Sequence, residues 1–258
     1  MENSSVVKID SMGGFIKDIC ILIPAYNPGE LLVQLVSSLI KAGFSHIIVV
    51  NDGSIAECVP IFERIKKMEQ CHLLRHAVNL GKGRALKTGL NYFLINFPNS
   101  PGIITCDADG QHQVEDVVKV VKVLQDNPDS LIIGVRDFDK DVPLLSKFGN
   151  VITRSIFFFL VGKYLSDTQT GLRGIPVGFM PMLILLDGEG YEFEMNMLIA
   201  SKTQNISTIE ERISTIYIDN NRLSHFNPLL DSMKIYFLLL RFFFSSILAS
   251  IQEWKPKK

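Results

Sequence analysis

The stretch IITCDADGQHQVEDVVKVV, residues 103–121, joins an apolar run to a helix-like segment through an acidic turn. Its first residues form a short continuous apolar run, which is typical of a strand buried on both faces of a parallel sheet. Its last residues repeat apolar side chains at helical spacing, so together the two parts predict one strand–helix unit. Between them, Asp107 and Asp109 stand two residues apart at the expected end of the strand.

The same alternation of strand and helix is found upstream of this stretch and just after it. Apolar runs predict strands at 18–26, 46–54, 71–76, 102–109 and 130–137. Helical spacing predicts helices at 29–43, 59–68, 83–97 and 114–125. This alternation predicts an α/β fold, a Rossmann-like, mostly parallel sheet flanked by helices. Further on we expect helices at 145–162 and 190–203, a polar loop at 165–175 and a strand at 212–218.

Length and composition favour one globular α/β domain. The chain has 258 residues, of which 47% are hydrophobic and 21% charged, and its formal net charge of −1 argues against a nucleic-acid binder. We expect a flexible N-terminal segment at 1–17, the α/β domain at 18–230 and a terminal amphipathic segment with a basic tail at 231–258. The first 15 residues lack the apolar centre of a secretory signal, which predicts a cytoplasmic site of action.

The terminal segment is open to three interpretations. Its apolar core begins at Ile235 and is interrupted by Arg241, and Trp254 follows before a lysine-rich tail. It is short for a span of about 20 residues, whereas Trp254 and the lysines suit a lipid headgroup zone. A helix on the membrane surface is favoured over a core or oligomer helix, and both are favoured over a true span.

The paired aspartates predict a metal site. In parallel α/β sheets, ligands bind beyond the carboxyl ends of the strands, and side chains two apart on a strand share one face. Two carboxylates held together repel unless a cation lies between them, and oxygen ligands favour Mg²⁺ or Mn²⁺. Asp107 and Asp109 are therefore expected to hold a metal-bound diphosphate, with Gln111 as a further oxygen ligand. A simple Asp-Gly turn is the alternative.

The segment NLGKGRALKTG, residues 79–89, is a glycine-rich loop before a helix. It lacks the glycine that a Walker A motif requires before Lys87 and Thr88. Its amides, together with Lys82 and Arg84, are expected to bind an anion. The alternative is a solvated helix start with basic side chains and no ligand.

The order of these motifs resembles family 2 glycosyltransferases of the GT-A fold over about residues 19–230. The pieces that carry the resemblance are IPAYNPG (23–29), VVNDGS (49–54), NLGKGRALKTG (79–89) and the Asp-Ala-Asp turn. The resemblance implies a nucleotide-sugar donor whose base and ribose lie near Pro24, Ala25, Tyr26 and Asn27, with Asp52 bonded to the base. It also implies a divalent metal on the donor diphosphate. Many relatives carry an acidic residue after the asparagine, where this chain has Pro28.

The second half resembles a narrower branch, the polyprenyl-phosphate sugar transferases such as the dolichyl-phosphate mannose and undecaprenyl-phosphate glucose synthases. The matching pieces are GVRDF (134–138), SKFGNVITR (146–154), SDTQTGLRG (166–174), YEFEMNML (191–198) and SHFNPLLDSMKIY (224–236). A lipid phosphate is largely dianionic at neutral pH, so it can attack an anomeric carbon directly, with inversion, and needs cationic positioning more than a base.

Basic and polar residues of the second half are assigned to the acceptor side on this basis. Arg136 and Arg154 are expected to hold the acceptor phosphate, because guanidinium matches phosphate geometry, and Lys147 is expected to assist. Gln169 and Thr170 are expected near the sugar. His225 is a further candidate near the diphosphate, although a lone histidine is more often structural.

Other functions remain open at this point. A saccharide hydroxyl acceptor would need a carboxylate base, for which Asp167, Glu192 and Glu194 are candidates. A sugar-phosphate nucleotidyltransferase and a non-catalytic nucleotide binder rank lower. A UDP-sugar is preferred over GDP-mannose as donor. The lipid acceptor favours a peripheral position on the cytoplasmic membrane face, and a homo-oligomer is left open.

Overall fold

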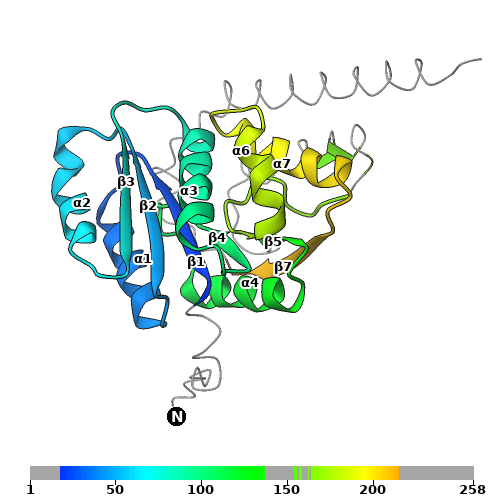
Figure 1. Ribbon diagram of the computed structural model, residues 1–258, viewed down its shortest axis with the longest axis horizontal. Helices are drawn as coiled ribbons and strands as arrows, with labels where there is room; N and C mark the ends of the chain where they lie inside the picture. Colours follow the sequence, from blue (N-terminus) through cyan, green and yellow to red (C-terminus); the bar gives the residue numbers. More distant parts are fainter. Residues whose placement is uncertain (1–17, 137–153, 156, 159–161, 163, 215–258) are drawn as a thin grey trace, which may run out of the picture.

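The computed structural model describes residues 18–136, 154–155, 157–158, 162 and 164–214, and its centre is a seven-stranded sheet. The strand order is β3-β2-β1-β4-β6-β5-β7 (Figure 1). The strands are β1 (Cys20–Ala25), β2 (His46–Asp52), β3 (Cys71–His76), β4 (Gly102–Thr105), β5 (Leu131–Arg136), β6 (Arg173–Pro176) and β7 (Thr208–Ile213). β6 runs antiparallel to β4 and β5, and the other neighbours are parallel, so the expectation of a mostly parallel α/β sheet is confirmed.

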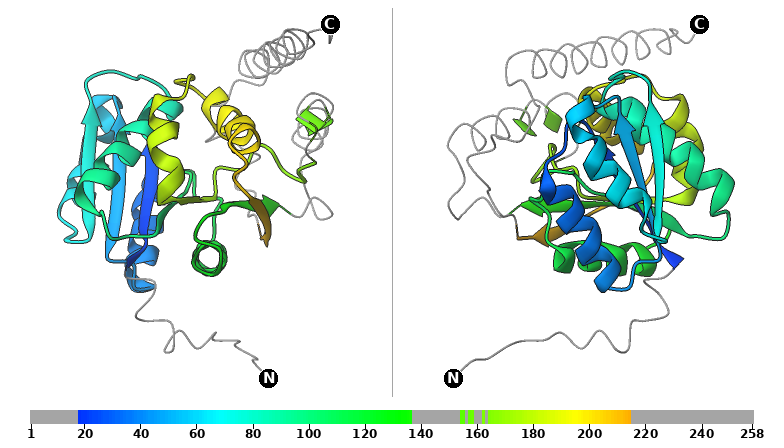
Figure 2. Two further views of the ribbon diagram at one scale, coloured as in Figure 1. Left: turned by 45° about the vertical axis from the view of Figure 1, so that its right-hand side comes forward. Right: turned by 90° about the vertical axis from the view of Figure 1, so that its left-hand side faces the viewer.

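Helices cover both faces of the sheet. The α-helices are α1 (Glu30–Lys41), α2 (Val59–Lys66), α3 (Lys82–Asn96), α4 (Val114–Asp126), α6 (Met180–Leu185) and α7 (Glu192–Thr203); short 3-10 turns, η3 (Ala56–Cys58) and η4 (Val177–Phe179), precede α2 and α6. One core joins α1, α2 and α4 to one face, and a second core joins α3, α6 and α7 to the other. Figure 2 shows these layers from two further sides.

Alternation along the central strand explains how both cores form. In β1, Cys20 and Leu22 belong to the core under α3, whereas Ile21 and Ile23 belong to the core under α1. Because successive side chains of a strand point to opposite faces, a continuous apolar run serves two helical layers at once. The helix α3 lies close to β1, since a Cβ at Gly89 would stand 2.1 Å from Leu22 Cδ1.

Two expectations for the second half are corrected. The segment expected as a polar loop at 165–175 ends in β6, which is buried and pairs with β4 and β5. The strand expected at 212–218 begins earlier, at Thr208. β6 has only four residues, including glycine, proline and arginine, and β7 is an edge strand rich in charged side chains. Neither shows the apolar pattern on which the predictions relied.

Several expected segments lie outside the described residues. These are the N-terminal segment 1–17, the terminal segment 231–258 with its membrane-surface helix, and most of the helix at 145–162. Residues 154–155 and 157–158 of that helix are described and are helical. Within the described part of the chain, no helix has the length and apolarity needed to cross a bilayer.

The packing of α3 against the sheet leads to a prediction about stability. Phe93 is fully buried in the core under α3, whereas Ile95 on the same helix is 69% exposed. We expect Phe93→Ala to lower the free energy of unfolding by about 3–5 kcal/mol, because it leaves a cavity. Ile95→Ala should change it by less than about 0.5 kcal/mol. Urea unfolding of both variants checks this, and equal losses would contradict the described packing of α3.

Candidate active site

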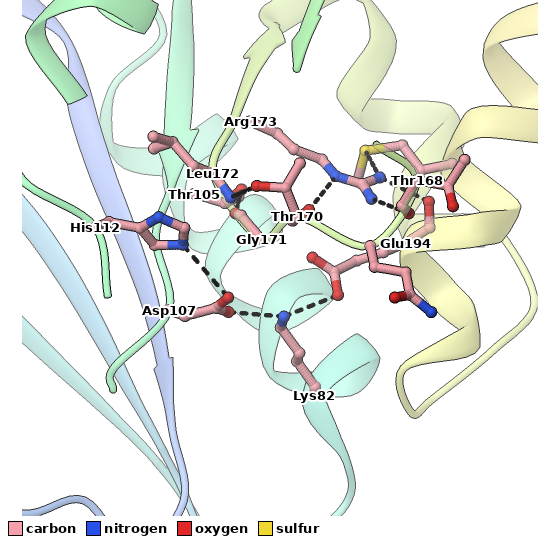
Figure 3. A network of polar contacts seen from close by, with 12 residues as sticks. Lys82, Thr105, Asp107, His112, Thr168, Thr170, Gly171, Leu172, Arg173 and Glu194 are labelled. Carbon is pink, nitrogen blue, oxygen red and sulfur yellow. Dashed lines mark hydrogen bonds and ion pairs between the residues drawn. The ribbon is translucent and has the colours of Figure 1, made fainter. Parts of the chain in front are cut away.

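The loops that follow β1, β2, β3 and β4 leave the sheet at the same edge, because these four strands are parallel neighbours. Ligands of parallel sheets bind beyond this edge. The motifs singled out in the first half of the sequence therefore come together there, as expected. Figure 3 shows the network of polar contacts at the centre of this region.

The loops after β1 and β2 are bonded to each other through Asn27. Its backbone N–H donates to Ser54 Oγ at 2.9 Å, and its side-chain oxygen accepts the N–H of Ile55 at 3.0 Å. Asn27 adopts a left-handed conformation, with φ of 47°, which asparagine tolerates better than most residues. Of the other residues expected around the nucleotide, Pro24 and Ala25 are buried within β1, and Tyr26 is half-buried.

Asp52, at the end of β2, accepts hydrogen bonds from three parts of the chain. Its Oδ1 accepts from His76 Nδ1 at 2.7 Å and from the N–H of Leu80 at 2.9 Å, and its Oδ2 accepts the N–H of Gly81 at 2.9 Å. The residue is 3% exposed. Two amides of the glycine-rich loop, which we expected to favour an external anion, are thus bound to a carboxylate of the chain itself.

The glycines of this loop are required by close backbone approach. Gly81 has φ of 101°, and a Cβ there would stand 2.3 Å from the carbonyl oxygen of Glu189. The segment after α6 is bonded to the start of α3, since the N–H of Arg84 donates to Glu189 O and Lys87 Nζ donates to Leu186 O at 2.8 Å. Arg84 and Lys87 also pair with the Glu189 carboxylate. Arg84 and Lys87 therefore serve contacts with the segment after α6.

Lys82 lies between two carboxylates that come from different halves of the chain. Its Nζ is 2.7 Å from Asp107 Oδ1 and 2.8 Å from Glu194 Oε2 (Figure 3). Burial alone would lower the pKa of the Lys82 ammonium, but the two carboxylates outweigh burial and raise it. Burial would likewise raise the pKa of Asp107, but Lys82 and His112 hold that pKa well below its usual range. Both groups are therefore charged at neutral pH.

His112 is a contact of Asp107 that the sequence did not point out. Its Nε2 lies 3.4 Å from Asp107 Oδ2, and the side chain is buried. Among the described residues its Nδ1 finds no hydrogen-bond partner. The only available signal was its position three residues after Asp109 in the same turn.

Asp107 and Asp109 lie in a turn beyond β4, which ends at Thr105. Strand alternation, on which we predicted a shared face, therefore does not set their directions. The turn does so instead, with Asp109 Oδ1 accepting the N–H of Gln111 at 3.1 Å and Gly110 at φ of 77°. Burial and the charge of Asp107 raise the pKa of Asp109, as expected for two carboxylates that share one site.

These residues fit a divalent cation. In the part of the chain that the structure describes, no cluster of three or more His, Cys, Asp or Glu side chains forms a closed metal site. The donor set at this edge is instead two carboxylates whose negative charges repel each other, which suits Mg²⁺ or Mn²⁺ with phosphate oxygens completing the shell. Asp107 and Asp109 would hold the ion. For Gln111, the described contact is its backbone N–H on Asp109.

The loop before β6 packs against this acidic turn. Thr105 Oγ1 donates to Gly171 O at 2.8 Å, and a Cβ at Gly171 would stand 2.2 Å from Asp107 Oδ2. Gln169, expected near the sugar, is half-buried in this loop, and the buried Thr170 accepts the N–H of Leu172 through Oγ1. Both residues precede Gly171 in the same loop, which lies against the acidic turn.

Arg173, which the sequence did not point out, is fully buried and binds the same loop through its guanidinium. Arg173 donates to three carbonyl oxygens, those of Thr168, Thr170 and Glu194, at 3.4, 3.1 and 2.6 Å (Figure 3). It is 0% exposed. Its bonds connect the loop before β6 to the first turn of α7, which carries Glu194. The buried arginine therefore helps to place both Gly171 and Glu194 beside Asp107.

The arginines expected at the acceptor are bound within the chain. Arg136 donates from Nε and Nη2 to the two oxygens of Asp167, at 2.6 and 3.0 Å, which is a bidentate pair with a fully buried carboxylate. Arg154 Nη1 donates to Ser166 O at 3.4 Å, and its guanidinium lies over the ring of Tyr164. The other two expected residues, Lys147 and His225, lie outside the described residues.

Comparisons with known proteins agree with this geometry. The profile of glycosyl transferase family 2 matches residues 20–180, which include every strand end described above except that of β7. An uncharacterised protein of Methanocaldococcus jannaschii is 32% identical over 93% of this chain and 96% of its own length. The UDP-N-acetylglucosamine–dolichyl-phosphate N-acetylglucosaminyltransferase of Methanococcus voltae is 29% identical over 87% of this chain and 95% of its own.

The fold is also found among solved structures. The glucosyl-3-phosphoglycerate synthase of Mycobacterium tuberculosis, solved with Mn²⁺, UDP and phosphoglyceric acid, superposes with a TM-score of 0.65. The match covers 94% of this chain and 84% of that protein at 15% identity, so it shows the fold alone. The seven-stranded sheet is therefore of the kind found in that synthase.

The position of Lys82 yields a testable prediction. Lys82→Met should lower the free energy of unfolding by about 3 kcal/mol at pH 8, because it leaves Asp107 and Glu194 charged without their shared cation. In the wild type the depressed pKa of Asp107 stabilises the fold above the ordinary carboxyl pKa of about 4, and this is lost as the pH falls. The deficit of the variant should therefore shrink as the pH falls through about 4.

The matched control is Arg84→Met, two residues along the same helix. Arg84 is half-exposed and pairs with Glu189, so its loss should cost less than about 1 kcal/mol at any pH. Urea unfolding of the wild type and both variants between about pH 3 and pH 8 makes the comparison. Equal and pH-independent losses would show that Lys82 does not act as a counter-ion.

Proposed function

Because the chain belongs to glycosyl transferase family 2, we propose that it transfers a sugar from a nucleotide sugar to a polyprenyl phosphate, with inversion at the anomeric carbon. A UDP-sugar is the preferred donor. The similarity to a transferase named for UDP-N-acetylglucosamine and dolichyl phosphate supports both parts of this proposal, since it extends over most of both chains.

The choice of acceptor rests on the contacts that three carboxylates make within the chain. A hydroxyl acceptor needs a base to remove its proton, and the candidates for that base were Asp167, Glu192 and Glu194. Asp167 accepts from Arg136 and from the N–H of Gln169, Glu192 Oε1 accepts two backbone N–H groups, and Glu194 contacts Lys82. Each is thus held by a contact within the chain, and among their described oxygens Glu192 Oε2 is buried without a hydrogen-bond partner. A phosphate dianion needs no base, so this arrangement favours a phosphate acceptor.

The residues take the following roles in the proposed reaction. Asp107 and Asp109 would hold a divalent cation together with the donor diphosphate, and a bound Mg²⁺ or Mn²⁺ would supply positive charge to stabilise the leaving diphosphate. Arg136 and Arg154 position the acceptor phosphate, Arg136 with its plane fixed by Asp167. The phosphate oxygen then attacks from the side opposite the diphosphate. A lipid acceptor also puts the enzyme at a membrane surface, which we propose is the cytoplasmic face.

One assay tests donor and acceptor together. The protein is incubated with polyprenyl phosphate, Mg²⁺ or Mn²⁺ and a panel of radiolabelled nucleotide sugars, and label in the organic phase is counted. We expect label with polyprenyl phosphate and none with the matching polyprenol, which presents a hydroxyl on the same chain. Label that reaches only water-soluble products, or reaches the polyprenol equally, would contradict the proposed acceptor.

Asp109→Asn should reduce sugar transfer by at least about a hundredfold, because an amide is a much weaker ligand for Mg²⁺ or Mn²⁺ than a carboxylate. Its burial and the charge of Asp107 raise the pKa of Asp109, so the neutral amide should not destabilise the fold. Glu115→Gln, at an exposed residue in the first turn of α4, is the matched control and should leave transfer unchanged. Transfer and manganese dependence that survive Asp109→Asn in a folded sample would remove Asp109 from the metal site.

A further inference from the structure

Three polar side chains, two of them buried and Thr88 half-buried, form a chain of contacts that the proposed reaction does not use. His76 Nδ1 lies 2.7 Å from Asp52 Oδ1, and His76 Nε2 lies 2.9 Å from Thr88 Oγ1. Asp52 ends β2, His76 ends β3 and Thr88 lies in the second turn of α3, so the chain of contacts joins three neighbouring elements. Asp52 and His76 are 3% and 9% exposed.

The chemistry of the partners fixes the proton on one side of the imidazole. A carboxylate only accepts, so the nitrogen facing Asp52 must carry the hydrogen, and His76 Nδ1–H donates to Asp52. In the neutral ring, Nε2 then accepts the hydroxyl hydrogen of Thr88; in the charged ring, Thr88 accepts instead. In both protonation states the contact with Thr88 fixes the rotation of the His76 ring, and the ring in turn fixes the orientation of the Asp52 carboxylate.

Asp52 is left with one acceptor position that the described contacts do not fill. A carboxylate has about four such positions. Oδ1 receives His76 and Leu80, whereas Oδ2 receives only the N–H of Gly81 among the described residues. The plane of the carboxylate is thus fixed by three bonds, and the remaining position on Oδ2 has a defined direction at the edge where the donor would bind.

We propose that His76 and Thr88 are positioning residues for nucleotide recognition, which hold Asp52 so that Oδ2 accepts an N–H of the donor base. The inference rests on the proposed function, since it needs a nucleotide donor. Because Oδ2 can only accept, it favours bases with a ring N–H beside a carbonyl, such as uracil, over cytosine, whose corresponding nitrogen carries no hydrogen.

A purely structural role explains these contacts less well. β2 and β3 are already aligned by their parallel ladder, in which Asp52 is the direct partner of His76. The side-chain bridge is not needed to set that register. Burying a carboxylate, an imidazole and a hydroxyl is costly, and apolar side chains of similar size would often stabilise such a site at least as well. The presence of this polar chain at the ends of two strands is therefore better explained by the orientation that it gives to the Asp52 carboxylate.

The test uses amides that mimic one ring nitrogen each. In His76→Asn the side-chain NH₂ can reach the place of Nδ1 and still donate to Asp52, whereas in His76→Gln it reaches the place of Nε2. His72→Asn is the matched control, because His72 lies at the other end of the same strand and bonds to Tyr92 Oη at 3.2 Å. The dissociation constants of UDP and CDP are measured by calorimetry with Mg²⁺ on the full chain, alongside thermal unfolding.

We expect His76→Gln to weaken UDP binding about tenfold, the loss of one hydrogen bond to a charged group. His76→Asn and His72→Asn should stay within about threefold of the wild type, and the preference of the wild type for UDP over CDP should fall in His76→Gln alone. Thr88→Val, which keeps the volume of the side chain but removes the hydroxyl that orients the ring, should weaken UDP binding, and Thr88→Ser should restore it. This pair decides the matter if His76→Gln does not fold.

Two results would overturn the proposal. One is UDP binding that His76→Gln and Thr88→Val leave unchanged, and the other is a His76→Asn variant that binds as weakly as His76→Gln. Both leave the proposed transfer reaction untouched, because they concern only the orientation of Asp52. Failure of the wild type to bind UDP or GDP and to label polyprenyl phosphate would instead remove the proposed function itself.

Discussion

The Lys82 ammonium is the contact on which the centre of the crevice depends. It reaches Asp107, beyond β4, and Glu194, in the first turn of α7, so it connects the acidic turn to a helix of the second half of the chain. Without a cation at this point, Asp107 and Glu194 would be buried charges with no partner on this side, and Asp109 would add to the repulsion. A donor diphosphate with its divalent ion would enter a site whose charges are already held apart by the chain.

The same principle holds the loops around the crevice. Charged side chains bind backbone groups of neighbouring segments: Asp52 binds the amides of Leu80 and Gly81, and Arg173 binds the carbonyls of Thr168, Thr170 and Glu194. Loop backbone that is buried needs such partners, because it has no ladder of its own. The shape of the site is therefore set by internal ions as much as by the sheet, which explains why so many charged residues near it are buried.

The sequence predicted the first half of the fold because each element there has a strong local signal. β1 is a continuous apolar run, and α4 repeats its apolar residues at helical spacing. The acidic turn was also visible, since two aspartates stand two residues apart at the end of an apolar run. β6 could not be predicted, because Arg-Gly-Ile-Pro has no strand pattern and becomes a strand only between β4 and β5. Two contacts of the site also depend on the tertiary fold. Glu194 lies 112 positions from Lys82, and no sequence motif marked His112 as a contact of Asp107.

Arg136, which we propose for the acceptor side, illustrates how an internal ion pair could prepare a phosphate site. Asp167 is fully buried and binds Arg136 through two parallel hydrogen bonds, so it fixes the plane of the guanidinium and offsets its charge. A lone arginine would bind a free anion tightly but in many orientations. An arginine held by a carboxylate presents its hydrogen atoms in one direction and binds less strongly, which suits a phosphate that must act as a nucleophile. Stronger binding of that phosphate in the ground state would raise the activation free energy of the transfer step unless the transition state were bound equally more tightly.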